Sequence, residues 1–173
     1  TLVVYTPAVP KNHSELNYFI DNKYTVVKRA EALGVIAGVK RTLAVAGTHG
    51  KTTTSTLLAH LLSKSAVGCD AFLGGIAKDF KSNLVISDKN TEMLVVEADE
   101  FDRSFLSLNP HLAIITSVDA DHLDIYGSHS KVLEAFRAFT GQIQEHGVLI
   151  VKSGLDFIPN LKSSGRTFTY SLK

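Results

Sequence analysis

The chain of 173 residues has very little cysteine, no long apolar run and no excess of charge of either sign. Cys69 is its single cysteine, which excludes an internal disulfide framework and a multi-cysteine metal site. Eighteen basic and seventeen acidic side chains give a formal charge of +1, so no overall field attracts a nucleic acid or an anionic membrane. No apolar run approaches the ~20 residues of a membrane span, and no signal segment opens the chain. We therefore predict a cytoplasmic protein that binds small molecules, with Cys69 as a small buried apolar side chain.

Four short apolar runs are the clearest structural signal after residue 40. Their hydrophobicity is continuous rather than alternating, which is typical of strands that are covered on both faces. Two amphipathic segments between them have the spacing of helices. We predict an α/β fold with a mostly parallel sheet flanked by helices. The strands are expected at Leu43–Ala46, Met93–Val96, Leu112–Ile115 and Val148–Val151, and the helices at Thr53–Ser65 and Lys131–Gln144.

The first 41 residues repeat this strand–helix pattern on a smaller scale. Two strands and two helices cannot bury a core unaided, so we expect no separate sheet here but the tail of a preceding α/β domain. Because the chain begins with Thr1 rather than Met, we expect a piece of a longer protein. We predict that residues 1–41 end an N-terminal domain and that residues 42–173 form a central domain, incomplete at its C-terminus. The small elements are expected at Leu2–Tyr5, Ser14–Asp21, Tyr24–Val27 and Glu31–Val39.

Residues 47–54, G-T-H-G-K-T-T-T, lie between a buried strand and a helix and predict a phosphate-binding loop for ATP. Its glycines let the backbone approach a phosphate closely, the lysine supplies a point charge, and the next threonine offers a hydroxyl to Mg²⁺. One departure is Val45, where loops of this type usually have glycine. The predicted ATP-binding residues are Gly47, Thr48, His49, Gly50, Lys51, Thr52 and Thr53.

Acidic residues follow the predicted strand Met93–Val96, and a histidine among further acids follows the strand Leu112–Ile115. In a parallel sheet the loops after neighbouring strands lie at the same edge. A carboxylate near Thr52 would complete the oxygen shell that Mg²⁺ prefers. A solvated acidic loop is the alternative for this cluster. His122 could be either a metal ligand or a helix cap. The candidate acids are Glu97, Asp99, Glu100 and Asp102, and His122 lies among Asp119, Asp121 and Asp124.

Three motifs in order resemble the Mur ligases of peptidoglycan synthesis: the loop 47–54, E-A-D-E-F-D at 97–102 and D-H-L-D-I-Y at 121–126. The resemblance implies a UDP-binding, Rossmann-like domain that ends near residue 41, followed by the central P-loop ATPase domain. It also implies an ATP-dependent ligase that joins L-alanine to the carboxylate of UDP-N-acetylmuramate through an acyl phosphate. Since a further domain would admit the amino acid, this piece alone is expected to be inactive.

The resemblance also implies roles for single residues. Lys51 would contact the phosphates, Thr52 and Glu97 would hold one Mg²⁺, and His122 would contribute to a second site, so that Lys51, Glu97 and His122 are the predicted catalytic residues. Mn²⁺ could substitute for Mg²⁺. Two departures from relatives are Ser117, where many have asparagine, and the absence of lysine from residues 134–137, where some carry a modified one.

Three alternatives stay open at this point. A recycling ligase that attaches a whole peptide to the same sugar acid would share this ATPase domain. A folate-polyglutamylating enzyme has a similar core but is disfavoured by the histidine in the loop. A nucleotide-binding module that ligates nothing would need only one metal site. The sequence leaves the oligomeric state open.

Overall fold

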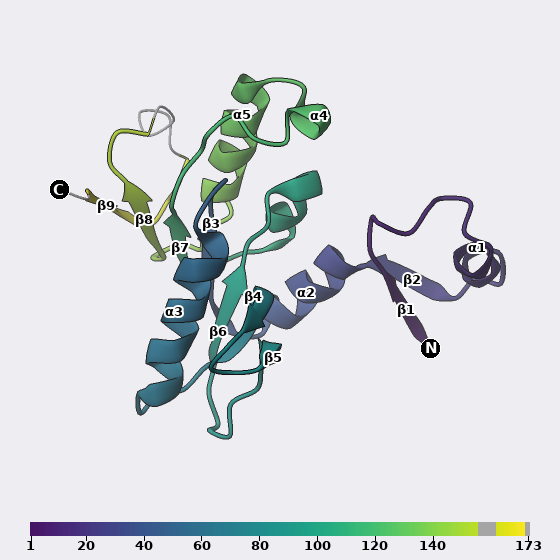
Figure 1. Ribbon diagram of the computed structural model, residues 1–173, viewed down its shortest axis with the longest axis horizontal. Coiled ribbons are helices and arrows are strands. Elements are labelled where there is room, and N and C mark those ends of the chain that lie inside the picture. Colours follow the sequence, from purple (N-terminus) through teal and green to yellow (C-terminus); the bar gives the residue numbers. More distant parts are fainter. Residues whose placement is uncertain (156–161, 172–173) are drawn as a thin grey trace.

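A computed structural model describes residues 1–155 and 162–171, which form two β-sheets connected by a helix (Figure 1). The first part contains β1 (Leu2–Tyr5), α1 (Ser14–Asp21), β2 (Thr25–Lys28) and α2 (Arg29–Gly38). The expectation that this part has no sheet was wrong, because β1 and β2 pair in parallel as a separate two-stranded sheet. Figure 1 shows this pair and α1 apart from the main sheet, with α2 leading from one to the other. The predicted domain limits, 1–41 and 42–173, stay a prediction, and residues 156–161 and 172–173 lie outside the described residues.

The main sheet has seven strands in the order β5-β4-β6-β3-β7-β8-β9. All neighbouring strands are parallel except β4 and β5. The predicted α/β class with a mostly parallel sheet is therefore confirmed, although β4, β5 and β9 were not predicted. The strands are β3 (Arg41–Ala46), β4 (Asp70–Ala77), β5 (Ser82–Val85), β6 (Met93–Glu97), β7 (Leu112–Ile115), β8 (Val148–Lys152) and β9 (Arg166–Tyr170).

Helix α3 (Lys51–Lys64) packs against β3, β4 and β6 on one face of the sheet. Its Ala59 is buried beside Cys69, as predicted for that cysteine. Burial and the nearby charge of Asp70 raise the pKa of the Cys69 thiol to about 11, which makes it a poor nucleophile at neutral pH. The amphipathic spacing that predicted this helix is only partly matched by burial, because Leu57 and Leu61 are 59% and 68% exposed.

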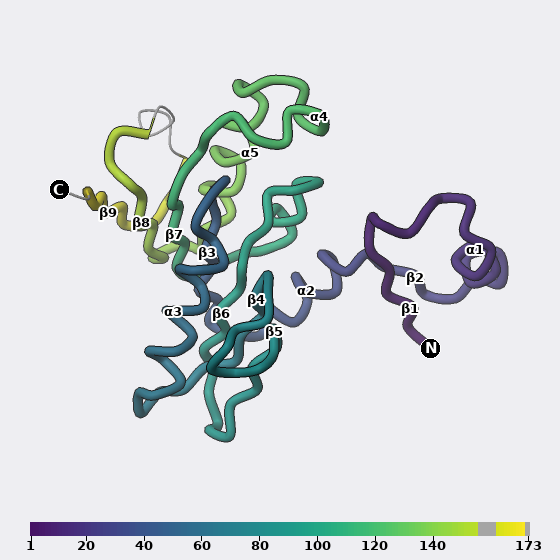
Figure 2. The backbone as a smooth tube through the Cα atoms, viewed as in Figure 1, coloured from purple at the N-terminus to yellow at the C-terminus, as the bar shows by residue number. Residues whose placement is uncertain are grey.

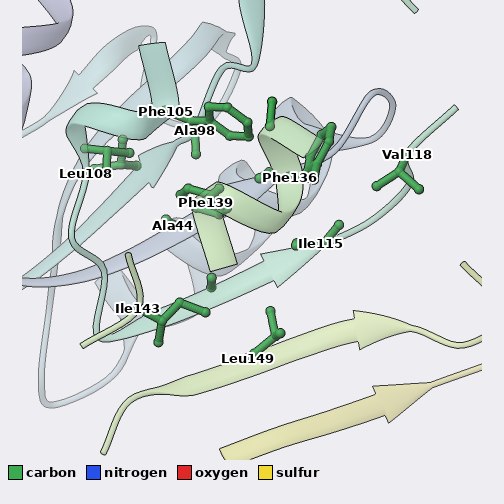
Figure 3. Packing of buried hydrophobic residues seen from close by; sticks show 14 of the residues in the cluster. Ala44, Ala98, Phe105, Leu108, Ile115, Val118, Phe136, Phe139, Ile143 and Leu149 are labelled. Atoms are coloured by element: carbon green, nitrogen blue, oxygen red, sulfur yellow. The ribbon is translucent and has the colours of Figure 1, made fainter. Parts of the chain in front are cut away.

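The opposite face is covered by α5 (His129–Thr140) and by a 3₁₀ helix, η1 (Phe101–Ser107). Figure 3 shows their aromatic side chains meeting above the strands. The ring of Phe105 stacks on Phe139, with centroids 4.8 Å apart, and meets Phe136 edge-on at 5.3 Å. All three rings are fully buried, so η1 is fixed to the core of the domain.

The central strands β6, β3 and β7 are neighbours and parallel, so the loops after them leave the same edge of the sheet (Figure 2). These loops carry the three predicted motifs. The short helix α4 (Leu123–Tyr126) follows the loop after β7. Within the described residues, none of the helices has the length and apolar character needed to cross a bilayer.

Candidate nucleotide and metal site

The loop after β3 has a backbone conformation that requires glycine at two positions. Gly47 and Gly50 have φ angles of +138° and +83°, which side-chain-bearing residues rarely adopt. A Cβ atom at Gly47 would also lie 2.1 Å from the Thr116 hydroxyl. Gly50 is the N-cap of α3, so the helix begins at Lys51, two residues earlier than predicted. The first N–H groups of α3 lack partners within the helix and face this loop, as an anion site requires.

Hydroxyl groups after β7 hold the loop in place. The Ser117 hydroxyl accepts a hydrogen bond from the His49 amide at 2.8 Å and lies 2.9 Å from the Thr48 hydroxyl. Thr48 Oγ1 in turn accepts from the Asp119 amide at 3.0 Å. Thr116 donates to the His49 carbonyl. Ser117 is therefore a support of the loop, and the buried Thr48 side chain takes part in the same network.

Lys51 turns its ammonium group toward Glu100. The Lys51 Nζ atom lies 2.7 and 2.9 Å from the two carboxylate oxygens of Glu100 and donates to the Gly47 carbonyl at 2.8 Å. Glu100 is fully buried, whereas 13% of the Lys51 side chain is exposed. Sequence reasoning proposed Glu100 only as one of four acids and missed this ion pair.

Thr52 and Glu97, the predicted metal pair, lie side by side. The Thr52 hydroxyl donates to Glu97 Oε1 at 2.9 Å, and register places Glu97 beside Val45 at the end of the neighbouring strand. The Gly74 amide donates to Glu97 Oε2 at 2.7 Å. A hydroxyl and a carboxylate are hard oxygen donors, which fit Mg²⁺. The contact with Gly74 was missed.

His122 lies apart from that pair, at the start of α4. Its Nε2 atom is 3.6 Å from Glu100 Oε1 and its ring meets Phe101 edge-on with centroids 5.5 Å apart. Its φ of +52° is left-handed, and among the described residues its ring makes no capping hydrogen bond. The geometry therefore gives no support to the capping alternative.

The described residues contain no group of three or more His, Cys, Asp or Glu side chains arranged to hold a metal ion. A metal at Thr52 and Glu97, or at His122, would take its other ligands from water and substrate, as Mg²⁺ often does. The remaining two acids serve other contacts. Asp99 accepts a hydrogen bond from the Phe101 amide, and Asp102 lines a cavity beside η1.

Tyr126, the last residue of α4, contacts the backbone of Glu100. Its buried hydroxyl donates to the Glu100 carbonyl at 2.6 Å. Burial, together with the charge of Glu100, raises the pKa of Tyr126 to about 12, so the phenol remains a donor at neutral pH. The motif at residues 121–126 contains this tyrosine, but its spacing alone did not indicate the contact.

A cavity of about 200 Å³ lies where the β2–α2 junction meets η1, beside the loop that carries Glu100 and not above the phosphate loop. Its lining includes three cationic side chains, those of Lys28, Arg29 and Arg103, and the acids Glu31 and Asp102. The excess of positive charge suits a ligand that carries phosphate or carboxylate groups.

Comparison with known proteins places this arrangement in a family. Residues 45–173 match the Mur ligase middle domain. The chain belongs to the Mur ligase family. The resemblance drawn from the three motifs is thus confirmed.

Two kinds of relative illustrate the match. This chain is 59% identical over 171 residues to the UDP-N-acetylmuramate–L-alanine ligase of Porphyromonas gingivalis. That alignment covers 99% of this chain but only 37% of the relative. A crystal structure of UDP-N-acetylmuramate-alanine ligase from Thermotoga maritima superposes with a TM-score of 0.81 at 26% identity, covering 99% of this chain and 39% of that one.

A third relative is the UDP-N-acetylmuramate:L-alanyl-gamma-D-glutamyl-meso-diaminopimelate ligase from Neisseria meningitides. Its structure superposes on this Mur ligase chain with a TM-score of 0.84 at 19% identity and covers 96% of this chain and 57% of that one. At this identity the likeness concerns the fold alone.

Proposed function

We propose that this chain is the ATP-binding part of a cytoplasmic ligase that joins L-alanine to the carboxylate of UDP-N-acetylmuramate during peptidoglycan synthesis. One observation carries the proposal: Lys51 and Thr52 are the first two residues of α3, and Glu97 at the end of β6 meets the Thr52 hydroxyl, so that a triphosphate and its metal would lie together there. The identity of 59% with the Porphyromonas gingivalis enzyme supports the choice of substrates.

The nucleotide would bind with its phosphates at the loop 47–53. Backbone N–H groups at the start of α3 would donate to phosphate oxygens, and the helix dipole favours negative charge there. Lys51 would supply the positive charge. The hydroxyls of Thr116 and Ser117 hold the outer turn of the loop through hydrogen bonds with the His49 backbone.

The donor set fits a divalent cation at Thr52 and Glu97, which would hold it through a hydroxyl and a carboxylate oxygen. When bound, such a cation neutralises charge on the phosphate oxygens of the nucleotide. His122 is proposed as a ligand of a second cation, since its ring is one-third exposed and is not used for capping.

The proposed reaction has two steps. The muramate carboxylate oxygen attacks the γ-phosphorus of ATP, the bond to ADP breaks, and an acyl phosphate forms. The alanine amine then attacks the acyl carbon, inorganic phosphate leaves and the amine loses a proton. Lys51 would offset the charge that builds up on the transferred group, which is the usual task of a P-loop lysine.

The cationic cavity beside η1 is the proposed place for part of the anionic sugar substrate. It adjoins Asp102 and Arg103, two and three residues after Glu100, so a ligand there lies near the motif that faces Lys51. Its other wall comes from the N-terminal part of the chain, through Lys28 and Arg29.

The complete gene product, incubated with ATP, Mg²⁺ and UDP-N-acetylmuramate, tests the proposal. We expect phosphate release and a new amide, detected by mass spectrometry, when L-alanine is added. Product with an L-alanyl-γ-D-glutamyl peptide but none with L-alanine would favour the recycling ligase. Tight ATP binding without substrate-dependent phosphate release from either donor would favour the non-ligating module.

A further inference from the structure

We propose that Glu100 is a positioning residue that fixes the ammonium group of Lys51 for phosphoryl transfer and does so at a cost in ATP affinity. The proposal rests on the ATP-dependent function given above. It separates Glu100 from Glu97, which lies three residues earlier in the same acidic motif and faces Thr52 instead.

The first support is the geometry of the pair. Both oxygens of the Glu100 carboxylate lie within 2.9 Å of Lys51 Nζ, and Glu100 has no exposed surface. Buried acids of this kind are rare unless paired. The ammonium also donates to the Gly47 carbonyl at 2.8 Å, so two fixed acceptors define its place.

The second support is the rigidity of the frame that carries Glu100. Its carbonyl accepts hydrogen bonds from the Tyr126 hydroxyl at 2.6 Å and from the Arg103 amide at 2.9 Å. Phe105, on the same 3₁₀ turn, is buried between the rings of α5. A site group that is held by its own surroundings keeps its partner in place more accurately than an exposed one.

The pair is expected to persist when ATP binds. If Lys51 left Glu100, a buried carboxylate would remain without its partner, which is strongly unfavourable. An ammonium group has three N–H donors, and the Gly47 carbonyl and Glu100 use two of them. The third remains for a phosphate oxygen, and its direction is set by the other two.

This arrangement has opposite effects on binding and on rate. The negative charge of Glu100 lies close to the triphosphate site and weakens ATP binding by simple repulsion. A fixed ammonium, in contrast, needs no reorganisation when charge develops in the transition state. Loss of the Glu100 charge should therefore lower kcat without weakening ATP binding.

The test is Glu100→Gln in the complete gene product, with Glu134→Gln on the exposed face of α5 as the matched control. We expect kcat for ligation to fall about tenfold or more, the dissociation constant of ATP to stay equal or decrease, and the Mg²⁺ half-saturation to be unchanged. The control should behave as wild type. An unchanged kcat, or a Mg²⁺ curve shifted to higher concentration, would overturn the proposal, the latter by making Glu100 a metal ligand.

A second measurement needs no amide formation and so separates this proposal from the proposed function. ATP titration of Lys51→Ala should show weak binding, because Glu100 then faces the phosphates without compensation. Adding Glu100→Gln should recover part of the lost affinity; no recovery would overturn the inference. If Glu100→Gln melts well below wild type, Glu100→Asp serves as the second variant. Its shorter side chain keeps the negative charge but moves the carboxylate away from Lys51, so it should lower kcat without tightening ATP binding.

Discussion

Replacement of Gly74 by alanine should damage the candidate metal site without disturbing the rest of the fold. Gly74 lies in β4 and its φ is in the ordinary range, so alanine can adopt its backbone. An alanine Cβ would, however, lie 2.2 Å from Oε1 and 2.5 Å from Oε2 of Glu97. Ordinary contacts begin near 3.4 Å, so the carboxylate must withdraw by about 1 Å.

That displacement breaks the contacts that define the Glu97 position. The hydrogen bonds from the Thr52 hydroxyl at 2.9 Å and from the Gly74 amide at 2.7 Å cannot both survive it. Two such bonds contribute about 1 kcal/mol each to stability, a modest loss. A misplacement of about 1 Å in a reacting assembly, in contrast, can cost on the order of a hundredfold in rate. We expect the activity loss to exceed the stability loss by far.

The assay is ligation by the complete gene product as a function of Mg²⁺ concentration, with thermal melts in parallel. Gly75→Ala is the matched control, because its Cβ would meet only Thr52 Cγ2 at 3.7 Å. We expect Gly74→Ala to need more Mg²⁺ and to turn over slowly, and Gly75→Ala to resemble wild type. Equal behaviour of the two variants, or a normal Mg²⁺ curve for Gly74→Ala, would refute the assignment of Glu97 to the metal.

Three further outcomes are expected. Lys51→Ala should lower turnover by about a hundredfold, or ~3 kcal/mol, in steady-state assays, and should also lower the melting temperature, because it leaves the buried Glu100 carboxylate without its partner; near-normal turnover would remove Lys51 from the mechanism. His122→Asn, whose new residue tolerates the left-handed backbone, should fold normally but lose most ligation and require more Mn²⁺ or Mg²⁺, whereas an unchanged metal curve with a lower melting temperature would make His122 structural. Burial alone would raise the pKa of Asp70, but hydrogen bonds from Lys40 and the Ser87 amide, with the Lys40 charge, hold it below its ordinary value. Asp70→Asn should therefore destabilise the protein at neutral pH, in melts followed by circular dichroism, and the difference from wild type should shrink as the pH falls through the folded pKa of Asp70; a difference independent of pH would contradict this.

The central strands were predictable because burial on both faces leaves an unbroken apolar run. Leu112–Ile115 was predicted to the residue, and the strand that ends at Ala46 was found with a later start. Strand β4 was not predicted because Gly74 and Gly75 interrupt its apolar pattern, and glycine is unfavourable in the interior of a strand. The reason for at least one of these glycines lies outside the strand, since Gly74 leaves room for Glu97. Strand β9 is mostly exposed at the sheet edge and so lacks the continuous hydrophobicity of its neighbours.

The loop that we propose to bind phosphate could also be located from the sequence, since its residue types meet local requirements of backbone and charge. What holds the loop was not, because its supports lie 67 to 71 residues away in sequence, on the segment after β7. Only the parallel pairing of β3 with β7 brings Ser117 beside His49. The sequence analysis noted Ser117 only as a departure from the resemblance, and the structure gives its hydroxyl a role in holding the loop.

The acidic motif shows most clearly where local reasoning ends. Glu97 and Glu100 are three residues apart, yet they face two different partners, the Thr52 hydroxyl and the Lys51 ammonium group. Glu97 closes a strand, so its direction follows from the pleat and from its register with Val45. Glu100 precedes a 3₁₀ turn that is fixed to the core by Phe105, so its direction follows from packing on the opposite face of the sheet. The sequence therefore shows that carboxylates gather here, whereas the end of β6 and the start of η1 determine which carboxylate faces Thr52 and which faces Lys51.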